Sequence, residues 1–239
     1  ADADDDATEM EAAPAAPALA LVTDSGLAGD GLTSIATFEI TAEAGSYVAI
    51  FRGDATTPEA VLSPDDATAP GVYRYTPVLS EGASASFTAQ AIDAAGNGST
   101  ASGSLAVTLD SASPQKPTLA LATDSLPADA IEAATDARQA LSSDGITNDL
   151  QLTITAESGS TVEVFAGAQK LGTAVETDSA GTFSFTPSQT LVDGSYELTA
   201  VATDTAGNKS AASDTLAVTL DSTKPEAPTL ARVTDSGTA

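Results

Sequence analysis

The 239-residue chain contains no cysteine, histidine or tryptophan, and methionine occurs only once. Without cysteine there is no disulfide and no thiolate ligand for a metal ion. Without cysteine and histidine, the usual serine- and cysteine-based triads and the usual zinc and other transition-metal sites are excluded too. We therefore expect a protein that is not an enzyme and whose fold is stabilised by something other than disulfides.

Basic residues are also scarce, with 8 Lys and Arg against 34 Asp and Glu, a net charge of −26 and a pI near 4.1. A phosphate backbone attracts the opposite charge, so we expect no nucleic acid partner. No stretch approaches the roughly 18 apolar residues of a membrane span, and we expect no direct membrane insertion. Such acidity is typical of disorder, of solvation at high salt or of cation chelation. The hydrophobic fraction of 42% and the strand-like alternation argue against disorder.

What the chain does contain is a repeat of about one hundred residues. PALALVTDSG (17–26) returns as PTLALATDSL (117–126) and again as PTLARVTDSG (228–237). ITAEAGSYVAIF (40–51) returns as ITAESGSTVEVF (154–165). A turn of the form Asp-x-Ala-Gly-Asn occurs at 93–97 and 204–208, and each copy of the unit ends in LAVTLDS. We expect a piece of a longer polypeptide with these boundaries: an acidic leader at 1–16, repeat 1 at 17–110, a linker at 111–116, repeat 2 at 117–221, and a linker with the first strand of a third repeat at 222–239.

Each unit alternates short apolar-polar runs with Gly, Asp and Pro turns, a pattern that predicts an all-β sandwich. In the first unit we expect strands near 18–23, 36–42, 47–52, 72–76, 85–92 and 104–109, with a weak one near 60–63. The inward side chains would be Phe38, Ile40, Val48, Ile50, Val72, Phe87, Ala89, Ala91, Leu105, Val107 and Leu109. Repeat 2 has an insertion at about 127–143, for which a short surface helix and an irregular loop both fit the composition.

The motifs PTLALATDS (117–125), DGITND (144–149), ITAESGSTVEVF, GTFSFTP (181–187), LVDGSYELTAVATDTAGNKS (191–210) and LAVTLDS resemble the bacterial Ig-like repeats of giant surface adhesins. These are the biofilm-associated and repeats-in-toxin (RTX) types of Gram-negative bacteria. The resemblance covers nearly the whole chain from residue 17. It implies tandem antiparallel Ig-like β-sandwiches arranged end to end as an extracellular rod, stiffened by Ca²⁺ near the joints. GDGLTS (29–34) lacks the Asn-Asp of DGITND, so repeat 1 departs from the pattern in its ligand set.

In an Ig-like sandwich, the turn after the first strand and the exit of the last strand share one end, and two other turns share the opposite end. This topology gathers acidic residues at the joints, and Ca²⁺ takes six to eight oxygen ligands of that kind, whereas Mg²⁺ demands tighter geometry. The core of the predicted metal site is Asp110, Asp204 and Asn208, with Glu157 next. By repeat logic the further candidates are Asp221, Asp24, Asp30, Asp93, Asn97, Glu43, Asp124, Asp144, Asp149 and Asp235.

Turn chemistry is the competing explanation, because Asp and Asn beside Gly suit tight turns without any ligand. Glu81 and Asp193 are interpreted as ordinary turn residues. Asn97 and Asn208 also begin short glycosylation motifs, which arise often by chance and which we discount.

The function that we expect is that of a structural extender in a secreted adhesin at the bacterial cell surface. It would be a monomer whose partners are neighbouring repeats of the same polypeptide, and it would project a distal binding domain for cell adhesion and biofilm formation. The alternative is an Ig-like domain that binds a glycan or a host protein, although no tryptophan is present to stack on a sugar. A third hypothesis, a hydrolase with paired carboxylates, has no pocket signal in the sequence.

Overall fold

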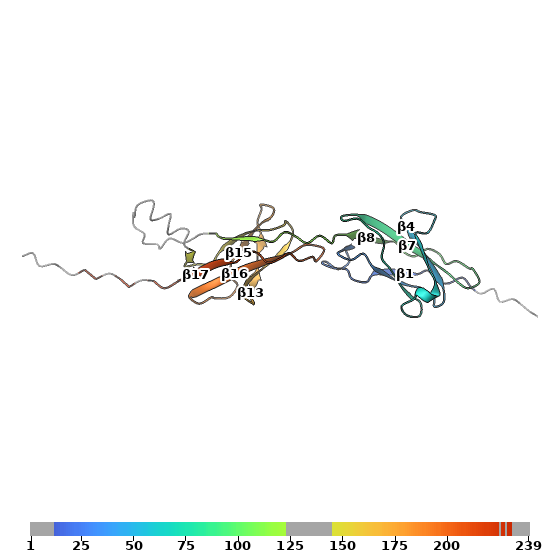
Figure 1. Cartoon of the computed structure of the whole chain (residues 1–239), viewed down its shortest axis with the longest axis horizontal. Coiled ribbons are helices and arrows are strands. Elements are labelled where there is room, and N and C mark those ends of the chain that lie inside the picture. The colour runs from blue at the N-terminus through green and yellow to red at the C-terminus, as the bar shows by residue number, and fades with distance from the viewer. Residues whose placement is uncertain (1–11, 123–144, 225, 228, 231–239) are drawn as a thin grey trace, which may run out of the picture. The chain divides into compact units, whose positions relative to one another are not determined.

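The structure is a computed structural model that describes residues 12–122, 145–224, 226–227 and 229–230. The described residues form strands and a single 3₁₀ turn, η1 (Pro64–Asp66). They group into two compact units. The first holds the described residues up to Gln115 together with Gly159–Thr161 and Ala202–Ala211, and the second holds the rest. The strands of the first repeat run from blue to green in Figure 1, and those of the second from yellow-green to red.

The first repeat is built from two sheets. The smaller has the order β1-β3-β6 and the larger β2-β8-β7-β4-β5. Neighbouring strands are antiparallel in both sheets, except that β2 runs parallel to β8. The strand bounds are β1 (Ala18–Leu21), β2 (Leu32–Thr33), β3 (Phe38–Thr41), β4 (Tyr47–Arg52), β5 (Ala60–Leu62), β6 (Val72–Tyr75), β7 (Ser84–Ile92) and β8 (Leu105–Leu109).

The core of the first repeat lies between these sheets, where alternate side chains of each strand point inward. Phe38 of β3 meets Phe87 of β7 with ring centroids 5.1 Å apart, so the aromatic contact joins one sheet to the other. Fully buried Ile40, Val48 and Ile50 complete the layer. The repeat is therefore a sandwich whose core depends on period-2 alternation.

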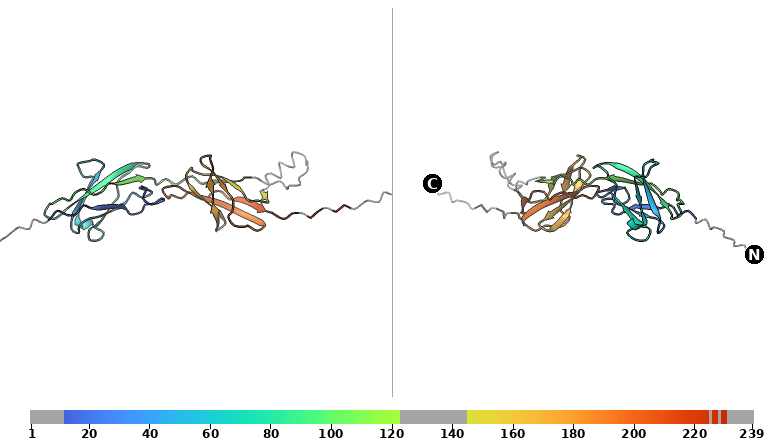
Figure 2. Two further views of the ribbon diagram at one scale, coloured as in Figure 1. Left: turned by 180° about the vertical axis from the view of Figure 1, so that it is seen from behind. Right: turned by 45° about the vertical axis from the view of Figure 1, so that its right-hand side comes forward.

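The second repeat follows this plan with one additional edge strand, β14, which pairs with β15, and its sheets have the orders β14-β15-β11-β9 and β10-β17-β16-β12-β13. Here β10 runs parallel to β17, as β2 does to β8. The two further views in Figure 2 show the same layered arrangement of strands within each repeat. The bounds are β9 (Thr118–Leu121), β10 (Ile146–Thr147), β11 (Leu152–Thr155), β12 (Thr161–Ala166), β13 (Gln169–Thr173), β14 (Val175–Glu176), β15 (Thr182–Phe185), β16 (Gly194–Thr203) and β17 (Leu216–Leu220).

The all-β sandwich prediction is confirmed, and the expected strands of the first repeat all form. One inward residue was predicted wrongly: Tyr73 is fully buried, whereas Val72 is only partly buried. Tyr73 can point inward because its hydroxyl donates to the backbone oxygen of Ser46, which removes the cost of burying a phenol. The strand β2 was not predicted, because two residues carry no periodicity.

Three expectations concern residues beyond those described. The insertion at 127–143 and residues 1–11 of the leader lie outside the described residues. So does most of the expected first strand of a third repeat, and the described residues 226–227 and 229–230 form no strand.

Candidate functional site

The two Asp-x-Ala-Gly-Asn turns have the same internal hydrogen bonds. In the first, the Asn97 backbone N–H donates to Asp93 Oδ1 at 2.7 Å, and Asn97 Nδ2 donates to Asp93 Oδ2 at 2.8 Å. In the second, Asn208 makes the same two bonds to Asp204, at 2.8 and 2.9 Å. The bonds from Asn97 lower the pKa of the Asp93 carboxyl. Each carboxylate is thus first of all the acceptor that closes its own turn.

The glycine of each turn explains why the motif needs that residue type. Gly96 has φ +89° and Gly207 has φ +85°. These angles lie in the left-handed region, which is costly for a residue with a Cβ.

Three predicted site residues lie together in the first compact unit, namely Asp110, Asp204 and Asn208. Asn208 Nδ2 donates to the backbone oxygen of Asp110 at 2.8 Å. The pKa of the Asp110 carboxyl is raised, first by burial, then by its hydrogen bond with Glu81 and by the negative charge of Asp204. Negative charge is therefore crowded around Asp110, which is the electrostatic condition that favours a bound cation.

Asp24 and Asp30 lie in the segment between β1 and β2. Asp24 Oδ2 accepts from the backbone N–H of Gly29, whereas Asp24 Oδ1 is buried without a hydrogen-bond partner. Asp30 Oδ1 accepts from the backbone N–H of Leu32 at 2.8 Å and closes a local turn. A buried carboxylate oxygen without a hydrogen-bond partner lowers the stability of the fold. A hydrogen-bond donor or a cation bound at Asp24 Oδ1 would remove this cost.

The remaining predicted ligands are more dispersed. Glu43 and Glu157 are exposed in turns. Asp149 accepts from Gln151 Nε2 at 2.7 Å, and Asp221 Oδ1 accepts from the backbone N–H of Thr223 at 3.0 Å. The other three candidates, Asp124, Asp144 and Asp235, lie outside the described residues.

The placement of these residues argues against a Ca²⁺ site made of carboxylates alone, whereas the chemistry of their side chains favours Ca²⁺. In the described part of the chain, no group of three or more Asp or Glu side chains is placed so that it could hold a metal ion. The donors that are present are nevertheless all oxygen atoms, with charge crowded at Asp110 and an unpartnered buried oxygen at Asp24. A hard cation suits such donors, and carbonyl groups and water supply many calcium ligands in proteins. The chemistry of the residues fits Ca²⁺, and the carboxylates would form only part of its shell.

Two acidic residues that were interpreted as ordinary turn residues have a more specific role. Glu81 accepts from both the backbone N–H and the hydroxyl of Ser111. Asp193 accepts from the same two groups of Ser222 and also from Thr223 Oγ1. These bonds lower the pKa of both carboxyls. The sequence signal was present in both repeats: an acid-Gly pair before the long strand and a Ser after each closing Leu-Asp.

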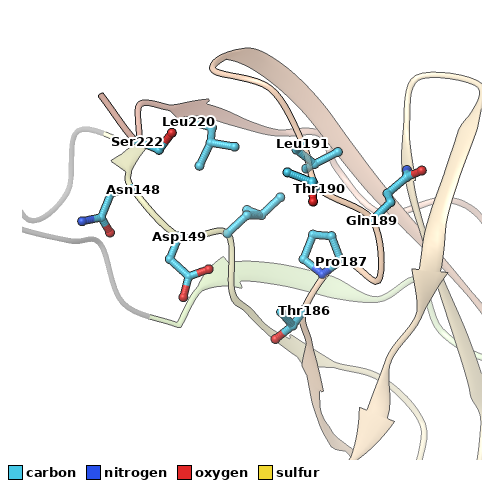
Figure 3. A pocket seen from close by; sticks show the side chains of 10 residues that line it. Asn148, Asp149, Thr186, Pro187, Gln189, Thr190, Leu191, Leu220 and Ser222 are labelled. Carbon is cyan, nitrogen blue, oxygen red and sulfur yellow. The ribbon is translucent and has the colours of Figure 1, made fainter. Parts of the chain in front are cut away.

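A shallow cavity of about 250 Å³ opens in the second repeat beside Asp149, Leu220 and Ser222, as Figure 3 shows. Two of its polar side chains are engaged in hydrogen bonds, because Asp149 accepts from Gln151 and Ser222 donates to Asp193. No aromatic residue lines it, so a sugar would find no stacking surface. The other lining residues are Asn148, Leu150, Thr186, Pro187, Gln189, Thr190 and Leu191.

Comparison with protein families gives a match in the second repeat. Residues 123–222 match the family described as a bacterial Ig-like domain. No curated protein matches the chain. Among the described residues there is no helix with the length and apolar character needed to cross a membrane.

Several solved structures are similar to the chain. The fibronectin(III)-like modules of CbhA from Clostridium thermocellum are 16% identical with a TM-score of 0.48, covering 84% of this chain and 93% of that one. The BSP domain of a biofilm-associated protein is 16% identical with a TM-score of 0.31, covering 89% of this chain and 30% of that one. The human OSCAR ligand-binding domain is 11% identical with a TM-score of 0.33, covering 87% of this chain and all of that one.

At these identities and TM-scores the similar structures carry no functional information. The family match bears on the Ig-like part of the predicted resemblance and leaves the RTX type untested. Residues 123–222 are therefore similar to bacterial Ig-like domains, as the motifs of the second repeat predicted.

Proposed function

We propose that the chain is part of the extender region of a secreted adhesin at the bacterial cell surface. In this role, tandem Ig-like sandwiches project a distal binding domain for cell adhesion and biofilm formation. One observation carries the proposal: one sandwich plan, with an equivalent strand order apart from the additional edge strand β14 and with the same parallel pair, is built twice in one chain. The match of residues 123–222 to bacterial Ig-like domains supports the bacterial assignment. Repetition of one plan, with little individual surface chemistry, suits a spacer better than a receptor.

The second part of the proposal is that Ca²⁺ stiffens this extender. Asp110 and Asp204 would supply carboxylate oxygens, carbonyl groups and water would complete the shell, and the bound cation would relieve the negative charge around Asp110. A cation that binds only the docked, folded arrangement stabilises it by about 2.7 kcal/mol at a hundredfold excess over its Kd. Weak sites of the kind found in extracellular modules fill at millimolar calcium.

Calcium titration followed by thermal unfolding tests this second part. We expect added CaCl₂ to raise the melting temperature of the full chain and EDTA to reverse the change, with a smaller effect of MgCl₂. Sodium chloride at matched ionic strength is the control, because simple screening would also stabilise a chain of charge −26. Asp110→Asn should weaken the calcium response, whereas Asp178→Asn, at an exposed position, should leave it unchanged.

Small-angle scattering in the same buffers tests the stiffening. We expect the chain to become more flexible in EDTA. A melting temperature and a scattering curve that are both the same in calcium and in EDTA would refute the calcium part of the proposal.

A further inference from the structure

The Asp193 carboxylate holds the chain at the point where it leaves the second repeat. Its Oδ1 accepts from the Ser222 backbone N–H at 2.9 Å and from Ser222 Oγ at 2.7 Å. Its Oδ2 accepts from Thr223 Oγ1 at 2.7 Å. Asp193 immediately precedes β16, and Ser222 lies just beyond the end of β17. The start of one strand is therefore bonded to the exit of its neighbour.

The first repeat has the same arrangement with a glutamate. Glu81 accepts from the Ser111 backbone N–H at 3.0 Å and from Ser111 Oγ at 2.5 Å. The next residue, Gly82, donates its N–H to the backbone oxygen of Leu109 at 2.9 Å. Two side chains of different length thus reach the serine that follows the closing Leu-Asp, and the bond occurs in both repeats.

The position of these bonds matters because of the strands just before them. β17 pairs in parallel with β10, and the backbone N–H of Asp221 donates to Thr147 O at 2.9 Å. β8 pairs likewise with β2, and Asp110 N–H donates to Thr33 O at 3.0 Å. Parallel strands run in the same direction, so a pull on the exit slides the last strand along its partner and loads their hydrogen bonds together. The contacts of Ser222 and Ser111 lie outside this pair, so they are loaded first.

We propose that Asp193 and Glu81 are exit latches, which bear tension on the chain where it leaves each repeat. This inference rests on the proposed function, because an extender is pulled at both ends when the distal domain is attached. The bonds are suited to the role because a carboxylate acceptor makes stronger hydrogen bonds than a neutral one. The latch keeps the residues after the last strand bonded to the repeat. Force then acts along the whole parallel pair, and its hydrogen bonds do not break one after another from the end of the strand.

Single-molecule pulling on the full chain, tethered at its two ends, tests the latches. The two repeats differ in length, so the extension gained on unfolding identifies which of them has opened. Asp193→Asn should raise the unfolding rate of repeat 2 at fixed force by at least about threefold, and Glu81→Gln should do the same for repeat 1. Asp178→Asn and Asp54→Asn make the same charge change at exposed positions and should leave both rates unchanged.

A second variant and a second measurement keep the test decisive if Asp193→Asn weakens the whole repeat. Thr223→Val removes only the hydroxyl donor to Asp193 Oδ2, and it should also speed forced unfolding of repeat 2. Amide exchange at Ser222 should be faster in Asp193→Asn than in Asp178→Asn. Unfolding rates of the latch variants equal to those of their controls would overturn the inference.

All measurements are made both in EDTA and in calcium. The latch bonds join each carboxylate directly to serine or threonine donors, so their effect is expected in EDTA, where the calcium part of the proposed function predicts a loss of stiffness. Failure of the latch inference is thereby distinguished from failure of the calcium part of the proposed function.

Discussion

Glu81 Oε1 accepts a hydrogen bond from the backbone N–H of Ser111 at 3.0 Å, which holds its carboxylate beside Asp110, and the pKa values of these two acids shift in opposite directions. The pKa of Glu81 is lowered, mainly because Ser111 donates to it. The pKa of Asp110 is raised, mainly by burial and then by Glu81 and Asp204. The Asp110 carboxyl therefore loses its proton less readily in the folded chain than in the unfolded chain, and the Glu81 carboxyl loses its proton more readily.

The first prediction is that Asp110→Asn stabilises the chain at pH 7 in the absence of divalent cations. An acid whose folded pKa is raised contributes stability below its unfolded pKa, and this contribution is lost as the pH rises through the folded pKa. Asparagine removes the charge that burial and Asp204 oppose. The melting temperature of the variant should exceed that of the wild type at pH 7, and the difference should shrink as the pH falls toward 3.8, the ordinary pKa of the Asp110 carboxyl.

The second prediction concerns the turn of the first repeat. Asp93→Ala removes the acceptor of both Asn97 bonds, so it should lower the melting temperature of that repeat. The pKa of Asp93 is lowered, so the stability that its charge contributes is present above the unfolded pKa and is lost as the pH falls through the folded pKa. Thermal unfolding at a series of pH values down to 2 should show a smaller loss of stability on acidification in the variant. The same acid-induced loss in both proteins would contradict the prediction.

The third prediction compares equivalent positions in the two repeats. Tyr73→Phe removes the hydroxyl that donates to the Ser46 carbonyl, so it should cost about 1 kcal/mol of unfolding free energy in the first repeat. The second repeat has Phe183 at this place in GTFSFTP, so Phe183→Tyr offers the reverse change. Denaturant unfolding checks both, and we expect the free energy to fall in the former and to rise in the latter.

The fourth prediction concerns the contact between the two sheets. Phe87 is fully buried against Phe38, so Phe87→Ala should cost about 3–5 kcal/mol through the cavity that it leaves. Val78 is 87% exposed, and Val78→Ala should change the unfolding free energy by no more than about 0.5 kcal/mol. Equal losses in the two variants, measured by urea unfolding, would show that the core does not lie where the structure places it.

Much of the fold could be predicted because a strand has a period of two residues. An inward face is indicated by alternate apolar residues, such as Phe38 and Ile40 or Val48 and Ile50, even when the partner strand is not known. The turns could also be predicted from the sequence. In Asp-x-Ala-Gly-Asn the Asp supplies a hydrogen-bond acceptor, the Gly a left-handed backbone position and the Asn a donor, at fixed spacing. β2 escaped prediction because a strand of two residues is defined by its neighbour β8. Tyr73 was missed because its hydroxyl is paired with the backbone of Ser46, 27 positions away.

The candidate site divides in the same way. The repeat alone indicated that Asp93, Asn97, Asp204 and Asn208 form equivalent turns, and the hydrogen bonds within each turn are local in sequence. By contrast, the charge crowding at Asp110 and the unpartnered oxygen of Asp24 depend on how distant segments pack.

The sequence by itself determined the acidity of this protein, its repeat and its alternation of strands and turns, because these depend on residue type and on spacing along the chain. Only the tertiary structure decided what Glu81 and Asp193 do. Each meets a serine about 30 positions further along the chain, at the exit of a neighbouring strand. A turn motif determines the backbone conformation of its own residues. The hydrogen-bond partner of an exposed carboxylate depends instead on which strand of the folded protein ends beside it.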